Sequence, residues 1–340
     1  METFITPCWD AYLSEFLPEQ QDIYFREEYA RLYETEENTA FCFVCHDKKN
    51  FFLMPFLRRS VGRHFDFETP YGYGGPISNS DDEEWLKRAI ASMYVCFAQG
   101  KYICGFVRFH PLIENQRFCQ GKFEILRDRQ TVSIPLDDNE EQIWKEQISS
   151  KNRNMIRKAE KNDLEFCAEY DFVSISGFEN LYEDTMERVR AESFYYFPRV
   201  YYESFTNALN GKAFLGTVRQ RGELVCAALF MYSERYGHYH LSGGNRAGSS
   251  MGANNLMLWK AALEMKKLGV HEMHLGGGTT SSPEDSLFKF KKTFSKNEKI
   301  FYIGKMIFNP AVYKELCGKW RMAHPDRVEQ YGNRLLCYRY

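Results

Sequence analysis

The alternation of apolar and polar positions along the chain predicts a mixture of strands and helices. Short runs rich in aromatic and β-branched residues, bounded by glycines or polar turns, predict strands. In the first half of the chain these runs cover residues 40–47, 51–59, 103–110 and 129–136. Segments with apolar residues at helical spacing predict helices within 9–34, 83–99 and 138–162, the last of them with a break near Ser149 and Ser150. A loop containing several glycines and prolines separates the first hairpin from the helix at 83–99.

The second half repeats this order of elements. Strands are expected at 164–170, 212–219, 223–233, 236–244 and 270–278, and helices at 178–193, 199–210 and 253–269. Each half therefore runs through helices, a hairpin, a strand, a glycine-rich loop, a helix and a strand. Units of this kind predict two domains of the α/β class with mixed (α+β) sheets. We place the boundary at residue 150, which gives a first domain of 1–150 and a second of 151–321.

Composition narrows the classes of function. The 340 residues carry a formal net charge of −2, so no global basic field favours DNA. No apolar stretch approaches the roughly 20 residues of a membrane span, and the N-terminus lacks the pattern of a secretory signal. The ten cysteines are scattered and are interpreted as free thiols, so a cytoplasmic location is expected. The Cys42–His46 segment matches a haem-attachment pattern in letters, but it lies in a predicted strand, where two packed thiols are the better interpretation.

A glycine- and serine-rich segment, Ser242–Gly252, connects a predicted strand to a helix. Free backbone N–H groups at a helix N-terminus bind phosphate or carboxylate groups well. The segment is not a Walker A loop, because no Gly-Lys-Ser/Thr follows. A ligand-binding loop and an ordinary flexible connection both remain open.

Three further segments offer candidate binding residues. Glu68–Pro76 places two tyrosines between glycines at the end of a strand, which suits a ligand wall or a packed turn. Lys151–Lys161 carries five positive charges in eleven residues, with Arg153, Arg157 and Lys161 on one helical face. Such a face either binds phosphate groups or is simply exposed to solvent, and both interpretations stay open. Leu275–Gly278 ends a strand in glycines and is followed by the basic and aromatic run Leu287–Phe294, which suits a site or a solvated basic edge.

No nucleophile or metal site is evident. His238, His240, His271 and His274 lie in or next to predicted strands without a carboxylate at ligand spacing, so no metal site is expected. The chain also lacks a Gly-x-Ser-x-Gly elbow and a kinase signature. The catalytic residues are therefore left unassigned.

Together these segments resemble the Fem family of peptidoglycan-bridge aminoacyltransferases, and more broadly other FemAB-like GNAT-fold acyltransferases. Lys151–Asn162 resembles the family's basic helix, Ser242–Gly278 its loop, long helix and strand ending in glycines, and Ser286–Ser295 its Phe-Lys-x-x-Phe segment. The likeness spans most of residues 40–300. It implies tandem GNAT-like domains with a cleft between them, and a C-terminal tail, about 322–340, that packs back on the first domain.

The resemblance also implies the chemistry. Fem-type enzymes acylate an amine of a lipid- or nucleotide-linked cell-wall precursor, with aminoacyl-tRNA as donor, whereas other GNAT proteins use acyl-CoA. No bound cofactor is expected beyond one of these co-substrates. The acceptor-binding candidates are Tyr71, Tyr73, Arg153, Arg157, Arg199, Lys289 and Lys291. The donor-binding candidates are Arg246, Gly248, Ser249, Ser250 and Gly252.

Two other functions stay open at this point. The chain could be an acyl-CoA-dependent N-acyltransferase acting on a sugar amine or polysaccharide precursor. It could also be a non-catalytic GNAT-like module that binds a nucleotide-sugar or a partner protein. Ligand binding without turnover would distinguish the second alternative from the two enzymes.

Overall fold

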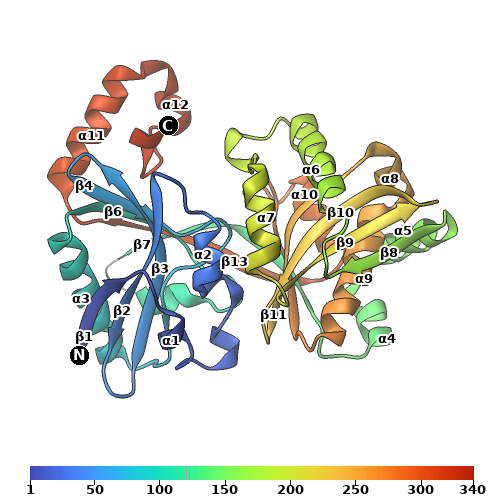
Figure 1. Ribbon diagram of the computed structural model, residues 1–340, viewed down its shortest axis with the longest axis horizontal. Coiled ribbons are helices and arrows are strands. Elements are labelled where there is room, and N and C mark those ends of the chain that lie inside the picture. The colour runs from blue at the N-terminus through green and yellow to red at the C-terminus, as the bar shows by residue number, and fades with distance from the viewer. Residues whose placement is uncertain (120, 122) are drawn as a thin grey trace. The chain divides into compact units, whose positions relative to one another are not determined.

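The computed structural model describes residues 1–119, 121 and 123–340 (Figure 1). The chain forms two compact units: unit 1 comprises Met1–Asp128 and Phe301–Tyr340, and unit 2 comprises Arg129–Ile300. The predicted boundary at residue 150 differs from this division, because that residue begins helix α5 (Ser150–Lys161) inside unit 2. The chain instead passes between the units within strands β7 (Glu124–Pro135) and β13 (Asn297–Ile307). Because the boundary lies inside strands, no segment there has the composition of a linker, and the sequence alone does not mark it.

Unit 1 is built on one mixed sheet. Its strands are β1 (Glu2–Thr6), β2 (Asn38–His46), β3 (Phe51–Val61), β4 (His64–Glu68), β5 (Ile77–Ser78) and β6 (Tyr102–Arg108). The order is β1-β2-β3-β4-β6-β13, with β5 on β3, and only β4 and β6 pair in parallel among these neighbours.

Helix α3 (Glu83–Gln99) matches the predicted helix residue for residue. Asp82 caps its N-terminus by accepting a hydrogen bond from the Trp85 N–H, and the buried face of the helix joins the aromatic core of the sheet. The predicted helices within 9–34 are shorter, as α1 (Asp10–Leu13) and α2 (Glu27–Arg31), with 3₁₀ turns between them. The C-terminal segment adds α11 (Pro310–Ala323) and α12 (Val328–Tyr331).

The last residues of the chain are tied to the sheet of unit 1 by a buried carboxylate. Asp66, on β4, is fully buried and accepts hydrogen bonds from Tyr338 Oη and Arg339 Nε, each at 2.9 Å. Its other oxygen accepts from Arg59 Nε at 2.9 Å. Arg59 and Arg108 in turn bind the two oxygens of Glu68. The tail thus closes a network of charged side chains whose members are all paired.

In unit 2 the strand order is β7-β12-β11-β10-β9-β8, with both parallel and antiparallel pairs. The strands not yet given are β8 (Leu164–Glu169), β9 (Ala213–Gln220), β10 (Glu223–Tyr232), β11 (Tyr236–Gly244) and β12 (Glu272–Gly277). The helices are α4 (Glu140–Gln142), α6 (Ile175–Val189), α7 (Arg199–Ala208), α8 (Arg246–Met251), α9 (Ala253–Lys267) and α10 (Ser286–Lys292), with a π-helical turn at Ile143–Gln147. Helices α6 and α7 cover one face of this sheet, and α5 and α9 cover the other (Figure 1).

Strands β11 and β12 separate part of the way along their length. Their parallel pairing covers Tyr236–His238 and Glu272–His274. Beyond this point β11 continues beside β10 and β12 continues beside β7. A register shift leaves His240 as an extra residue opposite β10, and such bulges bend and twist a strand. We call the diverging ends, residues 239–244 and 275–277, the strand fork.

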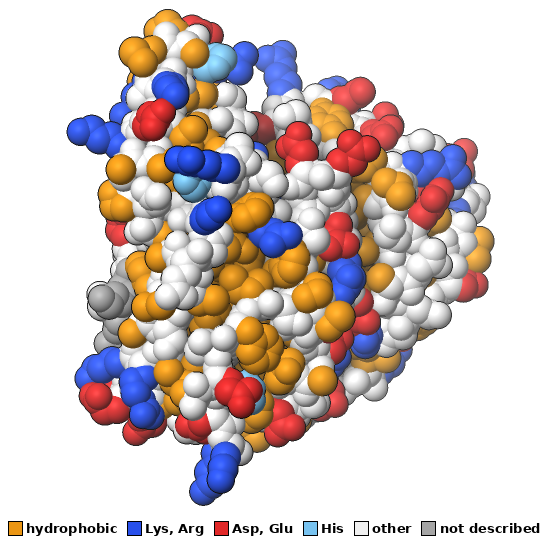
Figure 2. All heavy atoms as spheres, turned by 60° about the vertical axis from the view of Figure 1, so that its left-hand side comes forward, with side chains coloured by type: hydrophobic (Ala, Val, Ile, Leu, Met, Phe, Trp, Pro, Cys, Tyr) orange, Lys and Arg blue, Asp and Glu red, His pale blue; other side chains and the backbone are white. Residues whose placement is uncertain are grey.

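Among the described residues, no helix combines the length and the apolar character needed to cross a bilayer. In the face shown in Figure 2, Lys and Arg side chains stand close to Asp and Glu side chains around hydrophobic areas. This mixture agrees with the nearly balanced composition.

Candidate functional site

Lys291 lies at the strand fork of unit 2. Its side chain comes from α10 and its ammonium donates a 2.7 Å hydrogen bond to the carbonyl of Gly277, the last residue of β12. The ammonium also lies 5.7 Å from the centre of the Tyr239 ring on β11. The residue is only 7% exposed. One buried cation therefore contacts both branches of the fork.

The environment of Lys291 changes its acidity. Burial lowers the pKa of this amine from 10.5 to about 7, because a charge removed from water loses hydration energy. Asp285 opposes the shift and Arg129 adds to it. Lysine side chains whose pKa lies near neutrality occur at sites of acid, base or electrostatic catalysis. Lys291 is therefore the strongest candidate for chemistry within unit 2.

The opposite face of β11 carries a partly buried histidine, His240. Tyr201, on α7, lies 2.6 Å from His240 Nε2 through its hydroxyl, and the ring of Phe205 stacks on the imidazole. Burial lowers the pKa of His240 to about 3, so the ring is neutral at physiological pH. A histidine of this acidity is a weak base, so this pair serves to fix the bulge of β11 and α7 against each other.

The Ser242–Gly252 segment, which was predicted as a loop, is partly helical. Residues 246–251 form α8, and Asn245 caps it by accepting a hydrogen bond from the Gly248 N–H. The N–H groups of Ser249 and Gly252 bond to carbonyls of the same turn. The side chains of Arg246, Ser249 and Ser250 are exposed. The backbone donors expected at Gly248, Ser249 and Gly252 are therefore already satisfied.

Two glycines of this segment have packing roles instead. A Cβ on Gly252, where φ is +92°, would come 2.7 Å from the carbonyl oxygen of Met155 on α5. A Cβ on Gly248 would come 2.8 Å from Val225. The glycines allow α5, α8 and β10 to approach one another closely.

The basic helix α5 divides into structural and exposed residues. Arg153 Nη1 donates hydrogen bonds to the carbonyls of Trp144, Lys145 and Ile148, which ends the preceding helical turn. Arg157 is exposed, and its guanidinium lies 5.6 Å from the centre of the Trp144 ring. Arg153 was predicted to bind a phosphate, but its side chain already caps the end of this helical turn.

The other predicted cations do not join Lys291. Arg199, on α7, is exposed and paired with Glu203 in the same helix. Lys289 is also exposed and paired with Glu284. Pairs of this kind on the surface contribute little and leave the charge in water. Within the predicted set, Lys291 alone is a buried cation at the fork.

The two predicted tyrosines belong to unit 1. The hydroxyl of Tyr29 donates a 2.7 Å hydrogen bond to the carbonyl of Tyr71. The ring of Tyr73 makes edge contacts with the rings of Tyr24 and Phe301, at centroid distances of 5.5 and 5.3 Å. Both tyrosines are partly exposed. They form one wall of an aromatic cluster on this unit.

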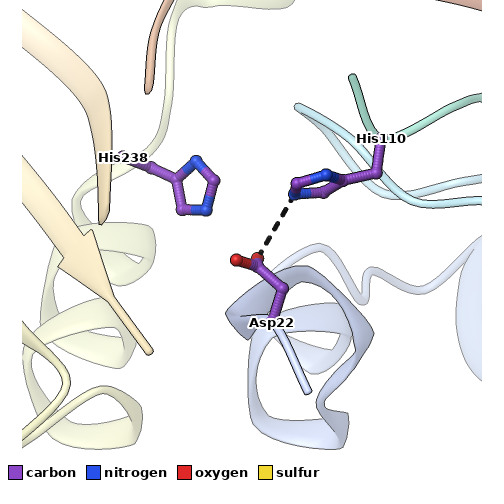
Figure 3. A group of neighbouring side chains, drawn as sticks. All are labelled: Asp22, His110 and His238. Atoms are coloured by element: carbon purple, nitrogen blue, oxygen red, sulfur yellow. Dashed lines mark ion pairs between the residues drawn. The ribbon is translucent and has the colours of Figure 1, made fainter. Parts of the chain in front are cut away.

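A buried acid–histidine pair lies beside this cluster. Figure 3 shows Asp22 and His110 of unit 1, whose Oδ1 and Nε2 atoms are 3.7 Å apart. Asp22 also accepts a hydrogen bond from the Tyr24 N–H, and the His110 ring lies 6.0 Å from that of Tyr73. The third labelled residue, His238, belongs to unit 2, where its ring lies 6.0 Å from that of His274.

Comparisons with known proteins show what the fold of the two units is similar to. Residues 150–292 match a family model described as an acetyltransferase (GNAT) domain. This match covers most of unit 2 and includes both branches of the fork. No curated protein sequence matches the chain.

Solved structures identify the more particular resemblance. The crystal structure of FemX is similar over 93% of this chain and 99% of its own, with a TM-score of 0.74 and 15% identity. The C-terminal domain of a putative lysylphosphatidylglycerol synthetase from Agrobacterium fabrum covers 95% of each chain, with a TM-score of 0.55 and 10% identity. A tandem GNAT protein from the clavulanic acid biosynthesis pathway covers 91% of this chain and 99% of its own, with a TM-score of 0.53 and 8% identity. The predicted Fem-like, tandem GNAT fold is thereby confirmed.

Sequence reasoning missed several residues of the fork. Asp285, Arg129 and Tyr239 all lie around Lys291, yet none stood out along the chain. Asp285 carried one available signal, since an aspartate directly before Ser286 and an apolar run is a typical N-cap. Arg129 and Tyr239 come from distant strands and gave no local signal.

Proposed function

We propose that the chain is an acyltransferase of the aminoacyl-transferring kind, which forms an amide on an amine of a cell-wall precursor. The observation that carries the proposal is the buried Lys291 ammonium at the fork of a GNAT-type unit. The Fem-like fold and the Phe-Lys-x-x-Phe segment that contains Lys291 support the same choice.

The reaction requires little from a nucleophilic side chain. The acceptor amine attacks the ester carbonyl of the donor, the new C–N bond forms, and the C–O bond to the donor breaks. The amine loses a proton and the departing hydroxyl gains one. Negative charge develops on the carbonyl oxygen, and a cation in a buried site stabilises this charge strongly. Lys291 already donates to one carbonyl oxygen, and its remaining N–H groups are suited to a second.

The geometry around α8 favours an aminoacyl ester over acyl-CoA as donor. A pyrophosphate is held by free backbone N–H groups at a helix N-terminus. Here the Gly248 N–H is bound by Asn245, and the Ser249 N–H is bound within the same turn. The acceptor follows from the resemblance to the Fem family.

A transfer assay with the full chain tests the proposal. The protein is incubated with UDP-linked muramyl peptide and either aminoacyl-tRNA or acetyl-CoA, and the products are identified by mass spectrometry. We expect an aminoacylated peptide from the tRNA donor. Acetylated peptide alone would establish the acyl-CoA enzyme instead. Binding of the muramyl peptide, seen as a raised unfolding midpoint, without product from either donor would favour the non-catalytic module.

A further inference from the structure

The loop that follows β12 is organised around one carboxylate. Asp285 Oδ2 accepts hydrogen bonds from the backbone N–H and the hydroxyl of both Thr279 and Thr280, at 2.6 to 3.1 Å. Asp285 Oδ1 accepts from the N–H groups of Leu287 and Phe288, at 2.9 and 3.0 Å. One side chain therefore joins the end of the strand to the first turn of α10.

The backbone next to this carboxylate leaves room for it. A Cβ on Gly278 would lie 2.4 Å from Asp285 Oδ1, so only glycine leaves room at this position. Arg129 Nη1 donates hydrogen bonds to the carbonyls of Gly278 and Thr279, at 2.9 and 3.2 Å. The backbone turn is thus held from the carboxylate side through its N–H groups and from the arginine side through its carbonyls.

Asp285 also sets the position of the helix that carries Lys291. The capped helix α10 starts at Ser286 and carries Lys291 less than two turns later, at about 1.5 Å per residue. The Lys291 ammonium then returns to Gly277, directly before the residue that contacts Asp285. The segment 277–291 is a closed loop, fastened by the carboxylate at one point and by the ammonium at another.

We propose that Asp285 is a positioning residue for Lys291, which holds α10 so that the ammonium stays at the fork. This inference rests on the proposed function for its catalytic consequence. It does not need that function for its physical content, because the geometry and charge of Lys291 can be measured directly.

The charged and titratable groups facing Lys291 come from each neighbouring element. They are Asp285 at the start of α10, Arg129 on β7 and the Tyr239 hydroxyl side chain on β11. Burial raises the pKa of Tyr239, so this ring is neutral. Asp285 raises the pKa of Lys291 while burial and Arg129 lower it. Removing the carboxylate charge therefore takes away one influence that favours the ammonium, while burial and the Arg129 charge continue to favour the neutral amine.

The experiment compares Asp285→Asn with Asp82→Asn. The second variant removes the charge from an equivalent helix cap, on α3 of unit 1, and controls for the general cost of such a change. NMR of lysine side chains labelled with ¹³C, assigned with Lys291→Arg, gives the titration midpoint of Lys291. The transfer assay gives kcat and KM separately.

For D285N we expect the Lys291 midpoint to fall below its wild-type value. We expect kcat to fall by about 10- to 100-fold, the scale of a small misplacement of a catalytic group, with KM nearly unchanged. D82N should change neither. An unchanged Lys291 midpoint and kcat in folded D285N would overturn the proposal and leave Asp285 as a helix cap only. A lowered midpoint in a chain that transfers no acyl group would keep the coupling and reject the proposed function.

Discussion

Replacing Asp66 with asparagine tests whether the buried network holds the C-terminal tail on unit 1. The substitution keeps the shape of the side chain and removes its charge. Asp66 is fully buried and serves Arg59, Tyr338 and Arg339 at once. In the variant, one amide must replace a carboxylate that bound two guanidinium groups.

The expected cost follows from the partners that remain. Breaking a buried ion pair by removing one partner costs about 3–5 kcal/mol. Arg59 keeps its contact with Glu68, and the side chain of Arg339 is 22% exposed and regains some hydration. We therefore expect the lower end, about 3 kcal/mol in the free energy of unfolding. For a unit of this size that loss lowers the unfolding midpoint by about 6–12 °C.

Thermal and urea unfolding measure the stability, and thiol labelling measures the tail. The hydroxyl of Tyr338 lies 3.1 Å from Cys104 Sγ, and Cys104 is fully buried, so a loosened tail should expose this thiol to a labelling reagent. Asp326→Asn is the matched control, because Asp326 is 77% exposed in a surface pair and should change stability by less than about 0.5 kcal/mol. A D66N protein as stable and as unreactive as D326N would refute this account of the network.

The remaining predictions concern packing, capping and pH. Gly243→Ala places a Cβ 2.4 Å from the α6 backbone and should lower the free energy of unfolding by about 1–3 kcal/mol. In the control variant Gly318→Ala the new Cβ meets no atom within 4 Å, so its stability should be unchanged or higher. Urea unfolding of both variants measures the difference. Arg153→Met removes three carbonyl contacts and should cost about 1–3 kcal/mol, against less than about 0.5 for exposed Arg157→Met in the same assay. Burial would raise the pKa of Glu68, but its arginine neighbours lower it below the ordinary 4.5. Its stabilisation is therefore complete above that pH and lost as pH falls through the lowered folded pKa, and acid titration of unfolding should show a shallower loss in Glu68→Gln.

Local signals predicted the helices and hairpins well. Helix α3 was predicted with its observed bounds because Asp82 caps it and Gly100 ends it, and both signals lie in the chain itself. The boundary between the units could not be predicted in the same way. It falls within β7, of which only residues 129–135 were predicted as a strand, and within β13, which was not predicted.

The site could be predicted only in part, because burial depends on the fold. Lys289, Lys291 and Lys292 are alike in sequence, and only the docking of α10 on β12 buries the middle one. The Ser242–Gly252 segment was expected to be an open loop from its glycines. The Asn245 cap and the close approach of Gly252 to α5 make part of it helical instead. These contacts join residues far apart in the chain, which periodicity and spacing do not reveal.

The most direct test of the central claim is the pH dependence of amide formation in Lys291→Met and Lys291→Arg, with exposed Lys296→Met as control. In the proposed mechanism the ammonium is the active form. Because burial lowers its pKa to about 7, wild-type kcat should fall as pH rises through that value. K291M should lose about 10²- to 10³-fold in kcat, the cost of one oxyanion donor. K291R should retain part of the activity without the alkaline fall, because arginine stays charged. A folded K291M protein with wild-type kcat would contradict the account. So would a wild-type kcat that rises as pH passes through 7, together with a complete loss of activity in K291R, because these results would show that Lys291 acts as a base.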